Sequence, residues 1–283
     1  MLATFGSQTT WMVAFCERHT ALLFAPSGSV LAEPLNVASN LLILLAAAAL
    51  VRRAVALRDI AVVPLSVRAL IALIAVVAFA SIVYHLAPMK WSWMLDVQSV
   101  HIFGLWFAAC FARWMLGLPW RQALFAIPLF GIFALTISEV VPDFGLDLAR
   151  FLPAAIALAV LTVWLARRDD PAWRSFGGAA IVFALGLGFH QYDTALCGPI
   201  PTGTHFLWHL CSGVMLFLIT RELLERAVAG EGQPSGRRSV GVSRSLGLAE
   251  QKRERSRLTS IRRSRMPTQA HEIPYQRDGH AAR

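Results

Sequence analysis

The sequence predicts an all-α integral membrane protein, a seven-transmembrane helix bundle with its N-terminus outside and its C-terminus in the cytoplasm. Composition is the first observation behind this fold class. Hydrophobic residues make up 56% and charged residues 15% of the 283 residues, whereas soluble domains carry about 25% charged residues. The mean hydropathy is +0.56, and the hydrophobic residues fall in long runs. A soluble globular core does not account for this composition.

The second observation is the number of apolar runs. A helix needs about 20 apolar residues to cross a ~30 Å hydrocarbon layer at 1.5 Å per residue. Seven runs reach or approach this length, at 35–51, 67–86, 97–115, 122–138, 151–166, 175–190 and 205–220.

The third observation is that basic residues are concentrated in the odd-numbered loops. These residues are Arg52, Arg53, Arg58 and Arg68 in the first loop, Arg113 and Arg121 in the third, and Arg167, Arg168 and Arg174 in the fifth. Loops rich in arginine and lysine remain in the cytoplasm. Even-numbered loops therefore face outward. The arginine-rich, compact chain suits a multi-pass protein of a bacterial inner membrane.

The C-terminal region, 227–283, differs in composition from the membrane domain, 1–226. It holds twelve Lys and Arg residues and five acids, so it supplies +7 of the net charge of +9. With few aromatic residues it cannot bury enough apolar surface to order itself, and we predict a disordered cytoplasmic tail. Contact with anionic lipid is one expectation for this tail, and a solvated tail without a partner is the other. We expect no nucleic-acid partner, because the pI of 10.4 reflects the tail alone.

Ionisable side chains near the outer ends of predicted helices mark the candidate site. His205 and His209 are four residues apart, and Ser81 and His85 share the same spacing, so each pair lies on one helical face. Asp96 opens the third predicted helix. An ionisable group in a spanning segment costs about 2.5–3.5 kcal/mol and indicates a functional site. The predicted topology places all these groups at similar depth near the outer surface.

Three imidazoles with a carboxylate nearby form the ligand set of a catalytic zinc ion. In that interpretation Asp96 orients the attacking water and accepts its proton, and Ser81 donates a hydrogen bond to the oxyanion. A single histidine in a membrane helix is more often a packing residue. A further alternative is a receptor or transporter whose histidines carry protons or bind a ligand. Clustering in one half of the bilayer favours a site over a proton path.

Four cysteines are present. Cys110 and Cys211 lie in apolar runs, where they are expected to pack as small core residues. Cys16 and Cys197 lie in connecting segments and could pair.

Several short motifs together resemble the alkaline ceramidases, within the superfamily of seven-helix membrane hydrolases that includes the adiponectin receptors. The motifs are Cys16-Glu17-Arg18, Ala32-Glu33-Pro34-Leu35-Asn36 with Ser39-Asn40, Ser81-x-x-x-His85, Asp96, and His205-x-x-x-His209. The resemblance implies a zinc ion held by the three histidines, with Ser81 and Asp96 at the bound water. It also implies hydrolysis of ceramide-like lipids to a fatty acid and a sphingoid base, a step of sphingolipid metabolism. Hydrolysis of another acyl lipid, an ester or an N-acyl amino lipid, remains open.

Two further features follow from the resemblance. A disulfide between Cys16 and Cys197 is one, on the outer face where oxidation is allowed. A calcium ion at Glu17 and Glu33 is the other, although Val13-Ala14-Phe15 departs from the family, which has an aspartate there. Calcium takes six or more oxygen ligands, and two carboxylates supply few of them. In the alternative, Glu17 and Glu33 pair with Arg18 or cap the first helix.

Overall fold

The computed structural model describes residues 15–18, 33–57, 62–141 and 148–231. The elements are α2 (Pro34–Ser39), α3 (Leu41–Ala56), α4 (Leu65–Leu86), α5 (Lys90–Trp114), α6 (Trp120–Ala123), α7 (Ala126–Val140), α8 (Leu148–Ala166), α9 (Trp173–Gln191), the 3-10 helix η1 (Thr194–Leu196) and α10 (His205–Glu231). No strand occurs in the described ranges, which confirms the all-α class for them. The described residues belong to one compact unit, Met1–Gln233.

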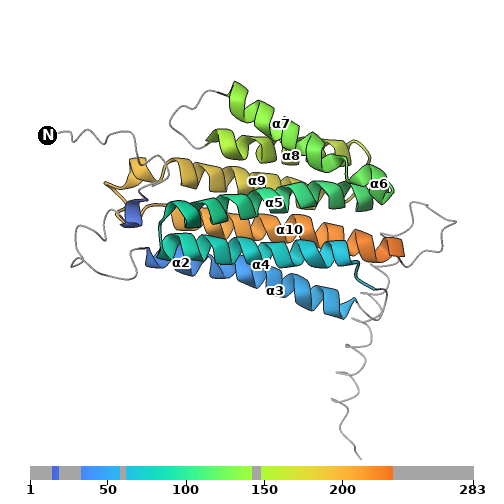
Figure 1. Cartoon of the computed structure of the whole chain (residues 1–283), viewed down its shortest axis with the longest axis horizontal. Helices are drawn as coiled ribbons and strands as arrows, with labels where there is room; N and C mark the ends of the chain where they lie inside the picture. Colours follow the sequence, from blue (N-terminus) through green and yellow to red (C-terminus); the bar gives the residue numbers. More distant parts are fainter. Residues whose placement is uncertain (1–14, 19–32, 58–61, 142–147, 232–283) are drawn as a thin grey trace, which may run out of the picture. The chain divides into compact units, whose positions relative to one another are not determined.

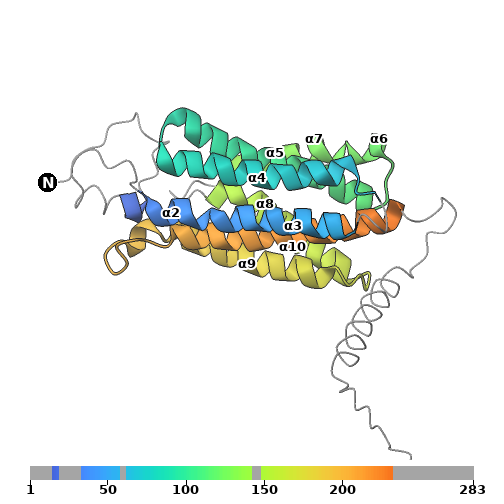
Figure 2. The same ribbon diagram turned by 90° about the horizontal axis from the view of Figure 1, so that it is seen from below.

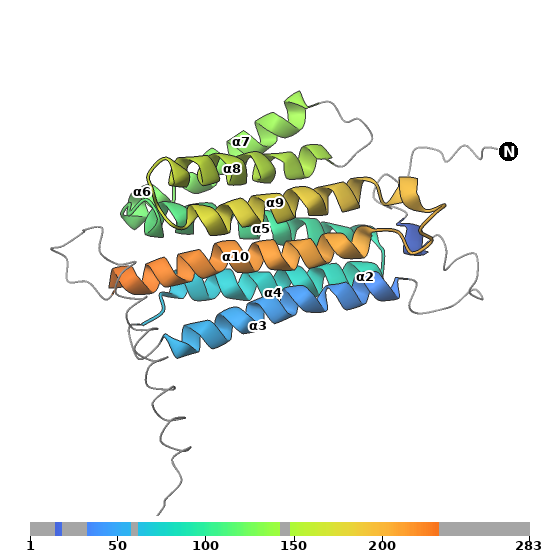
Figure 3. The same ribbon diagram turned by 180° about the vertical axis from the view of Figure 1, so that it is seen from behind.

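The long helices lie side by side along one direction (Figure 1). α10 has the most neighbours, since it packs against α2, α3, α4, α5 and α9. Figure 3 shows α10 running between α9 and α4, and Figure 2 shows α3 lying along it. α8 packs against α9, and α7 closes the arrangement by packing against α5 and α8. Side chains carried by α10 therefore face several other helices at once.

Six helical segments are long and apolar enough to cross a membrane. They are Pro34–Ala56, Leu65–Leu86, Lys90–Trp114, Trp120–Val140, Ala149–Ala166 and His205–Gly230. The remaining predicted run, 175–190, is also helical, as α9. α9 is less apolar because it carries Arg174 in its first turn, His190 and Gln191 in its last, and four glycines between. The chain is a multi-pass membrane protein, and the crossing of the bilayer by α9 stays a prediction.

Prolines set the start of several helices. Pro34 occupies the first turn of α2, and Pro64 and Pro119 directly precede α4 and α6. A proline lacks the backbone N–H that a helix start leaves unpaired, and its fixed φ suits this position. α5 begins differently, because the Ser92 hydroxyl accepts a hydrogen bond from the Met89 amide at 2.9 Å. This cap extends α5 to Lys90, seven residues before the predicted start at 97, so Asp96 lies in the second turn.

Gly213 lets α10 approach α3 closely. A Cβ atom at this position would lie 3.2 Å from the backbone nitrogen of Ile43 and 3.2 Å from the carbonyl carbon of Leu42. Small residues of this kind allow membrane helices to pack backbone to backbone. Because Gly213 follows His209 by one helical turn, the close contact holds His209 against the start of α3.

Ion pairs fix the other end of α10. Arg53 of α3 pairs with Glu225 at 3.0 Å, and Arg226 pairs with Asp170, in the turn before α9, at 2.7 Å. α10 continues to Glu231, so residues 227–231 are helical, although the sequence analysis places them in the tail. Leucines, alanine and valine on one face of these last turns are buried. The rest of the basic tail, 232–283, lies outside the described residues.

Candidate metal centre

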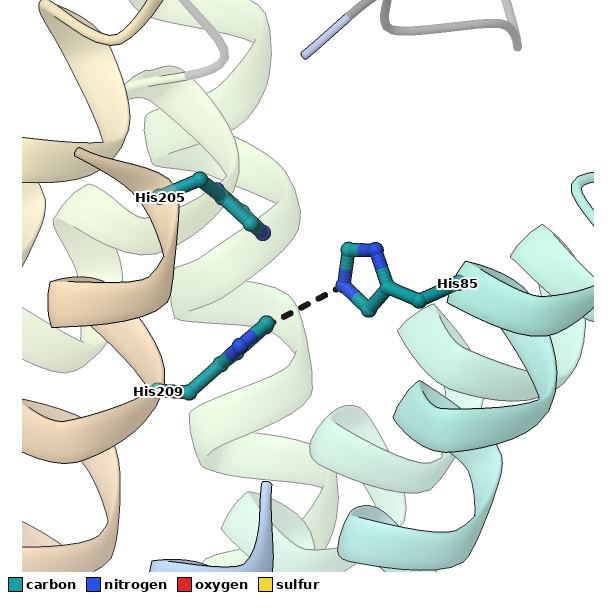
Figure 4. A group of neighbouring side chains, drawn as sticks. All are labelled: His85, His205 and His209. Carbon is teal, nitrogen blue, oxygen red and sulfur yellow. Dashed lines mark hydrogen bonds between the residues drawn. The ribbon is translucent and has the colours of Figure 1, made fainter. Parts of the chain in front are cut away.

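Three histidines from two helices meet at one end of the bundle. His85 lies in the last turn of α4, His205 begins α10, and His209 follows one turn later. Their exposed fractions are 1%, 4% and 3%, respectively. The i, i+4 spacing directs both imidazoles of α10 to the same side, and Figure 4 shows them pointing toward His85. The convergence expected from the sequence is confirmed.

The geometry of the three imidazoles fits a divalent metal ion. One nitrogen from each ring can be chosen so that all lie within 4.8 Å of one another. The Nε2 atoms of His85 and His209 are 3.2 Å apart, and tetrahedral zinc with bonds of about 2.0–2.1 Å would hold two nitrogens about 3.3 Å apart. The ring centroids lie 4.7–5.3 Å apart. Three neutral imidazoles leave a fourth position for water or substrate.

His209 is oriented by the junction of α2 and α3. Its Nδ1 lies 2.8 Å from the Ser39 hydroxyl. The Asn40 amide nitrogen, 3.3 Å from Nδ1, donates its hydrogen bond to the carbonyl oxygen of Asn36 at 2.8 Å. Ser39 donates its own proton to the carbonyl oxygen of Asn36 at 3.0 Å. The hydroxyl oxygen therefore accepts from Nδ1–H. This assignment leaves the lone pair of Nε2, the atom that faces His85, for a metal ion.

His85 is oriented by Glu33, which precedes α2. The Glu33 carboxylate contacts Nδ1 of His85. An ionised carboxylate only accepts hydrogen bonds, so the proton resides on Nδ1 and Nε2 keeps its lone pair. A carboxylate behind a metal-binding histidine is a recurring arrangement, because it fixes the tautomer and the ring orientation.

The environment of His205 suits a metal ligand. Its Nδ1 is buried and has no hydrogen-bond partner among the described residues. The ring of Phe15 stacks on the imidazole with centroids 3.7 Å apart, and the ring of His190 lies 5.0 Å away. A buried imidazole nitrogen without a partner carries a free-energy cost, and coordination of a metal through Nδ1 would remove it. The residues present thus fit a divalent metal ion.

Asp193, in the loop after α9, holds the start of α10 in place. Its Oδ1 accepts the backbone amides of Thr204 at 2.6 Å and His205 at 2.9 Å, and its Oδ2 accepts that of Cys16 at 3.0 Å. A carboxylate at a helix N-terminus pairs otherwise free amides and stabilises the helix dipole. The role of Asp193 is not evident from the sequence. Its only signal is an acidic residue in a loop without basic ones.

Gly203 makes this arrangement possible, and we expect Gly203→Ala to destabilise the protein. Gly203 has φ +67°, and a Cβ atom there would lie 2.1 Å from Asp193 Oδ1 and 2.7 Å from Cys16 Cβ. The left-handed backbone alone costs about 1–3 kcal/mol for a residue with a side chain, and the clash adds to it. A lower melting temperature of the detergent-solubilised protein would show the effect. Gly198→Ala is the matched control, because a Cβ at Gly198 meets no atom within 4 Å.

Cys16 and Cys197 form a disulfide with their Cα atoms 5.2 Å apart, as expected from the sequence. Cys110 and Cys211 are free. The bond joins the segment Phe15–Arg18 to the loop after η1. It therefore keeps Phe15 and Arg18 next to the histidines.

A thiol count tests this disulfide directly. Fully denatured, unreduced protein should react with two equivalents of a thiol reagent, from Cys110 and Cys211, and reduced protein with four. Four reactive thiols before reduction, with unchanged gel mobility after it, would show that the bond does not form.

Ser81 lies next to the histidines, whereas Asp96 does not join their group. Ser81 lies on α4, one turn before His85. Its hydroxyl is 3.5 Å from Nε2 of His209. Asp96 is absent from the set of ligand atoms that lie within 4.8 Å of one another. It is half-buried on α5 and interacts electrostatically with Arg150 of α8. A role for Asp96 at the bound water stays a prediction.

Both acidic residues assigned to calcium have protein partners. Glu17 accepts the backbone amides of Leu35 at 2.6 Å and Asn36 at 2.9 Å, and so caps α2. Glu33 contacts Arg18, Asn36 and His85. These contacts agree with the alternative in which the two acids cap a helix and pair with Arg18. Calcium binding stays a prediction without support from the described residues.

Burial affects the charges of these two carboxyl groups. It raises the pKa of Glu17, and the two backbone amides oppose the shift. Burial also raises the pKa of Glu33, and the Arg18 guanidinium is the main group that opposes it. The Arg18 guanidinium and the backbone amides thus offset only part of the cost of burying these carboxylates beside the histidines.

Comparison of the chain with protein-family models gives no match, and comparison with curated proteins gives none either. The ceramidase assignment therefore stays a prediction from the motifs in the sequence.

Proposed function

We propose that the protein is a membrane-embedded, zinc-dependent amidohydrolase that cleaves the N-acyl amide of ceramide-like lipids to a fatty acid and a sphingoid base. The single observation that carries this proposal is the buried group of His85, His205 and His209 at one end of an apolar bundle. Oriented histidines with a free coordination position are typical of catalytic zinc sites, whereas structural zinc sites are closed by four protein ligands.

The distribution of buried charge favours a site over a proton path. Among the described residues, the buried carboxyl, guanidinium and imidazole groups are all close to this end, in the last turn of α4, the first turns of α10 or the adjoining loops. They belong to Glu17, Arg18, Glu33, His85, Asp193, His205 and His209. The other described end carries partly exposed ion pairs. Transport of protons needs polar groups through the full depth of the bilayer, which supports a hydrolase over a transporter.

When bound, zinc would polarise the scissile carbonyl and make a water molecule acidic enough to attack near neutral pH. His85, His205 and His209 would hold it, with Glu33 and Ser39 fixing two of the imidazoles. Ser81 would donate a hydrogen bond to the carbonyl oxygen as negative charge develops there. Asp96 would accept a proton from the attacking water and return it to the amide nitrogen as the C–N bond breaks. The products are a carboxylic acid and a free amine.

The proposed topology places the reaction near the outer surface. With the C-terminus in the cytoplasm and seven crossings, the histidine end of the bundle faces outward. A ceramide-like lipid would enter from the outer leaflet, with its scissile carbonyl just below the headgroups. We propose a bacterial inner membrane as the host, on the arginine-rich cytoplasmic loops.

Hydrolysis of a fluorescent N-acyl sphingosine by purified, zinc-loaded protein tests the proposal. We expect equal amounts of fatty acid and sphingosine, and no release after zinc is chelated. An acyl ester of matched chain length serves as the comparison substrate. Cleavage of the ester alone would identify a different acyl lipid as substrate. If folded, zinc-loaded protein cleaves neither lipid, the hydrolase proposal is wrong.

A further inference from the structure

We infer that Arg18 acts through Glu33 to position His85 for metal binding. The inference rests on the metal site proposed above and assigns a positioning residue outside the ligand set. Arg18 belongs to the N-terminal segment, Glu33 precedes α2, and His85 ends α4, so the three residues connect separate parts of the chain.

Glu33 lies between Arg18 and His85 and contacts both. Its side chain is fully buried, with an exposed fraction of 0%. Oε1 pairs with the Arg18 guanidinium. Oε2 contacts Nδ1 of His85 and accepts a hydrogen bond from the Asn36 amide at 2.9 Å. Each carboxylate oxygen therefore has its own partner, and the plane of the carboxylate is fixed from both sides.

Arg18 is a charged residue that is almost fully buried. Its exposed fraction is 7%, and its guanidinium lies 5.9 Å from the centre of the Tyr84 ring. Nε, Nη1 and Nη2 have no hydrogen-bond partner among the described residues, and Nη2 meets Glu33 Oε1 as an ion pair. The ion pair with Glu33 is thus its principal polar interaction there. Withdrawing both charges from water costs several kcal/mol per ion, so stability alone does not explain the pair.

The disulfide places Arg18 where it can act. Cys16, two residues earlier, is bonded to Cys197, and its backbone amide donates to Asp193. The same Asp193 carboxylate accepts the amide of His205. The N-terminal segment is therefore attached to the start of α10, which carries two of the metal ligands, while Arg18 reaches the third ligand through Glu33.

These contacts explain how Arg18 would act on His85 through Glu33. The positive guanidinium keeps the Glu33 carboxylate turned so that Oε2 meets Nδ1 of His85. The hydrogen bond then holds the imidazole with Nε2 facing the histidines of α10, 3.2 Å from Nε2 of His209. Partners of this kind behind a metal ligand typically contribute 10–100-fold to metal affinity. Without Arg18, Glu33 would keep only Asn36 to hold it against His85.

Zinc affinity of the full-length protein, measured by competition with a chelating dye, tests the inference. We expect Arg18→Gln and Glu33→Gln each to weaken zinc binding about 10–100-fold. The double variant should lose little more, because the two residues act in series. The visible spectrum of the cobalt-loaded variants should change in intensity, since it reports the coordination geometry. Arg18→Lys should keep the wild-type spectrum, because the ammonium still pairs with Glu33.

Arg53→Gln and Glu225→Gln are the matched controls. They remove an ion pair at the far end of α3 and α10 and should leave zinc affinity and the cobalt spectrum unchanged. Wild-type zinc affinity in folded Glu33→Gln protein would overturn the inference while leaving the metal site intact. This variant decides the question if Arg18→Gln does not fold. Absence of zinc from wild-type protein would instead overturn the proposed function itself.

Discussion

Purified His209→Ala protein will contain far less zinc than wild-type protein, which we expect to carry about one equivalent. His209 Nε2 lies 3.2 Å from His85 Nε2, and its Nδ1 is held by Ser39, so its removal takes away one of the three imidazole ligands. Loss of a partner behind a ligand already costs about 10–100-fold in metal affinity. Loss of a ligand should cost more. Elemental analysis of the dialysed protein measures the effect.

His101→Ala provides the control for this variant. His101 lies on α5, is exposed, and does not belong to the histidine group, so its removal should leave the zinc content unchanged. Equal zinc contents in wild-type and His209→Ala protein would refute the ligand assignment.

Asp96→Asn should abolish release of fatty acid from N-acyl sphingosine while zinc stays bound. An asparagine keeps the size of the side chain but cannot accept the proton of the attacking water. General acid and base groups typically contribute 10²–10⁴-fold to the rate, and a loss within this range is expected in kcat. Rate and zinc content are measured on the same preparation, so that a catalytic defect is separated from loss of the metal.

The position of Asp96 makes this variant informative. Asp96 shares the histidine end of the bundle, yet it interacts electrostatically with Arg150. Arg150→Gln is therefore a useful comparison, because it removes that partner and leaves the carboxylate. Full activity of zinc-loaded Asp96→Asn protein would assign Asp96 a structural role beside Arg150 and remove it from the mechanism.

The histidine group could be predicted from the sequence because its signals are local. The i, i+4 spacing of His205 and His209 places both rings on one face. The apolar runs and the basic loops place His85 at the same end of the bundle. Each apolar run also falls on a helical segment of the described residues, because hydrophobicity determines which segments leave water.

The surrounding residues depend on tertiary contacts that no local pattern records. Glu33 and Asp193 are acidic residues near helix ends, and only the fold shows that one contacts His85 and the other the amide of His205. The early start of α5 depends on the Ser92 hydroxyl. The extension of α10 depends on ion pairs with Arg53 and Asp170, partners that are distant in sequence. Hydropathy alone misses all these boundaries.

A crystal of the zinc-loaded protein, with diffraction recorded on both sides of the zinc absorption edge, tests the central claim most directly. We expect one strong anomalous peak about 2.0–2.1 Å from a nitrogen of each of His85, His205 and His209. No peak among these rings, in crystals whose zinc content is confirmed, would contradict it.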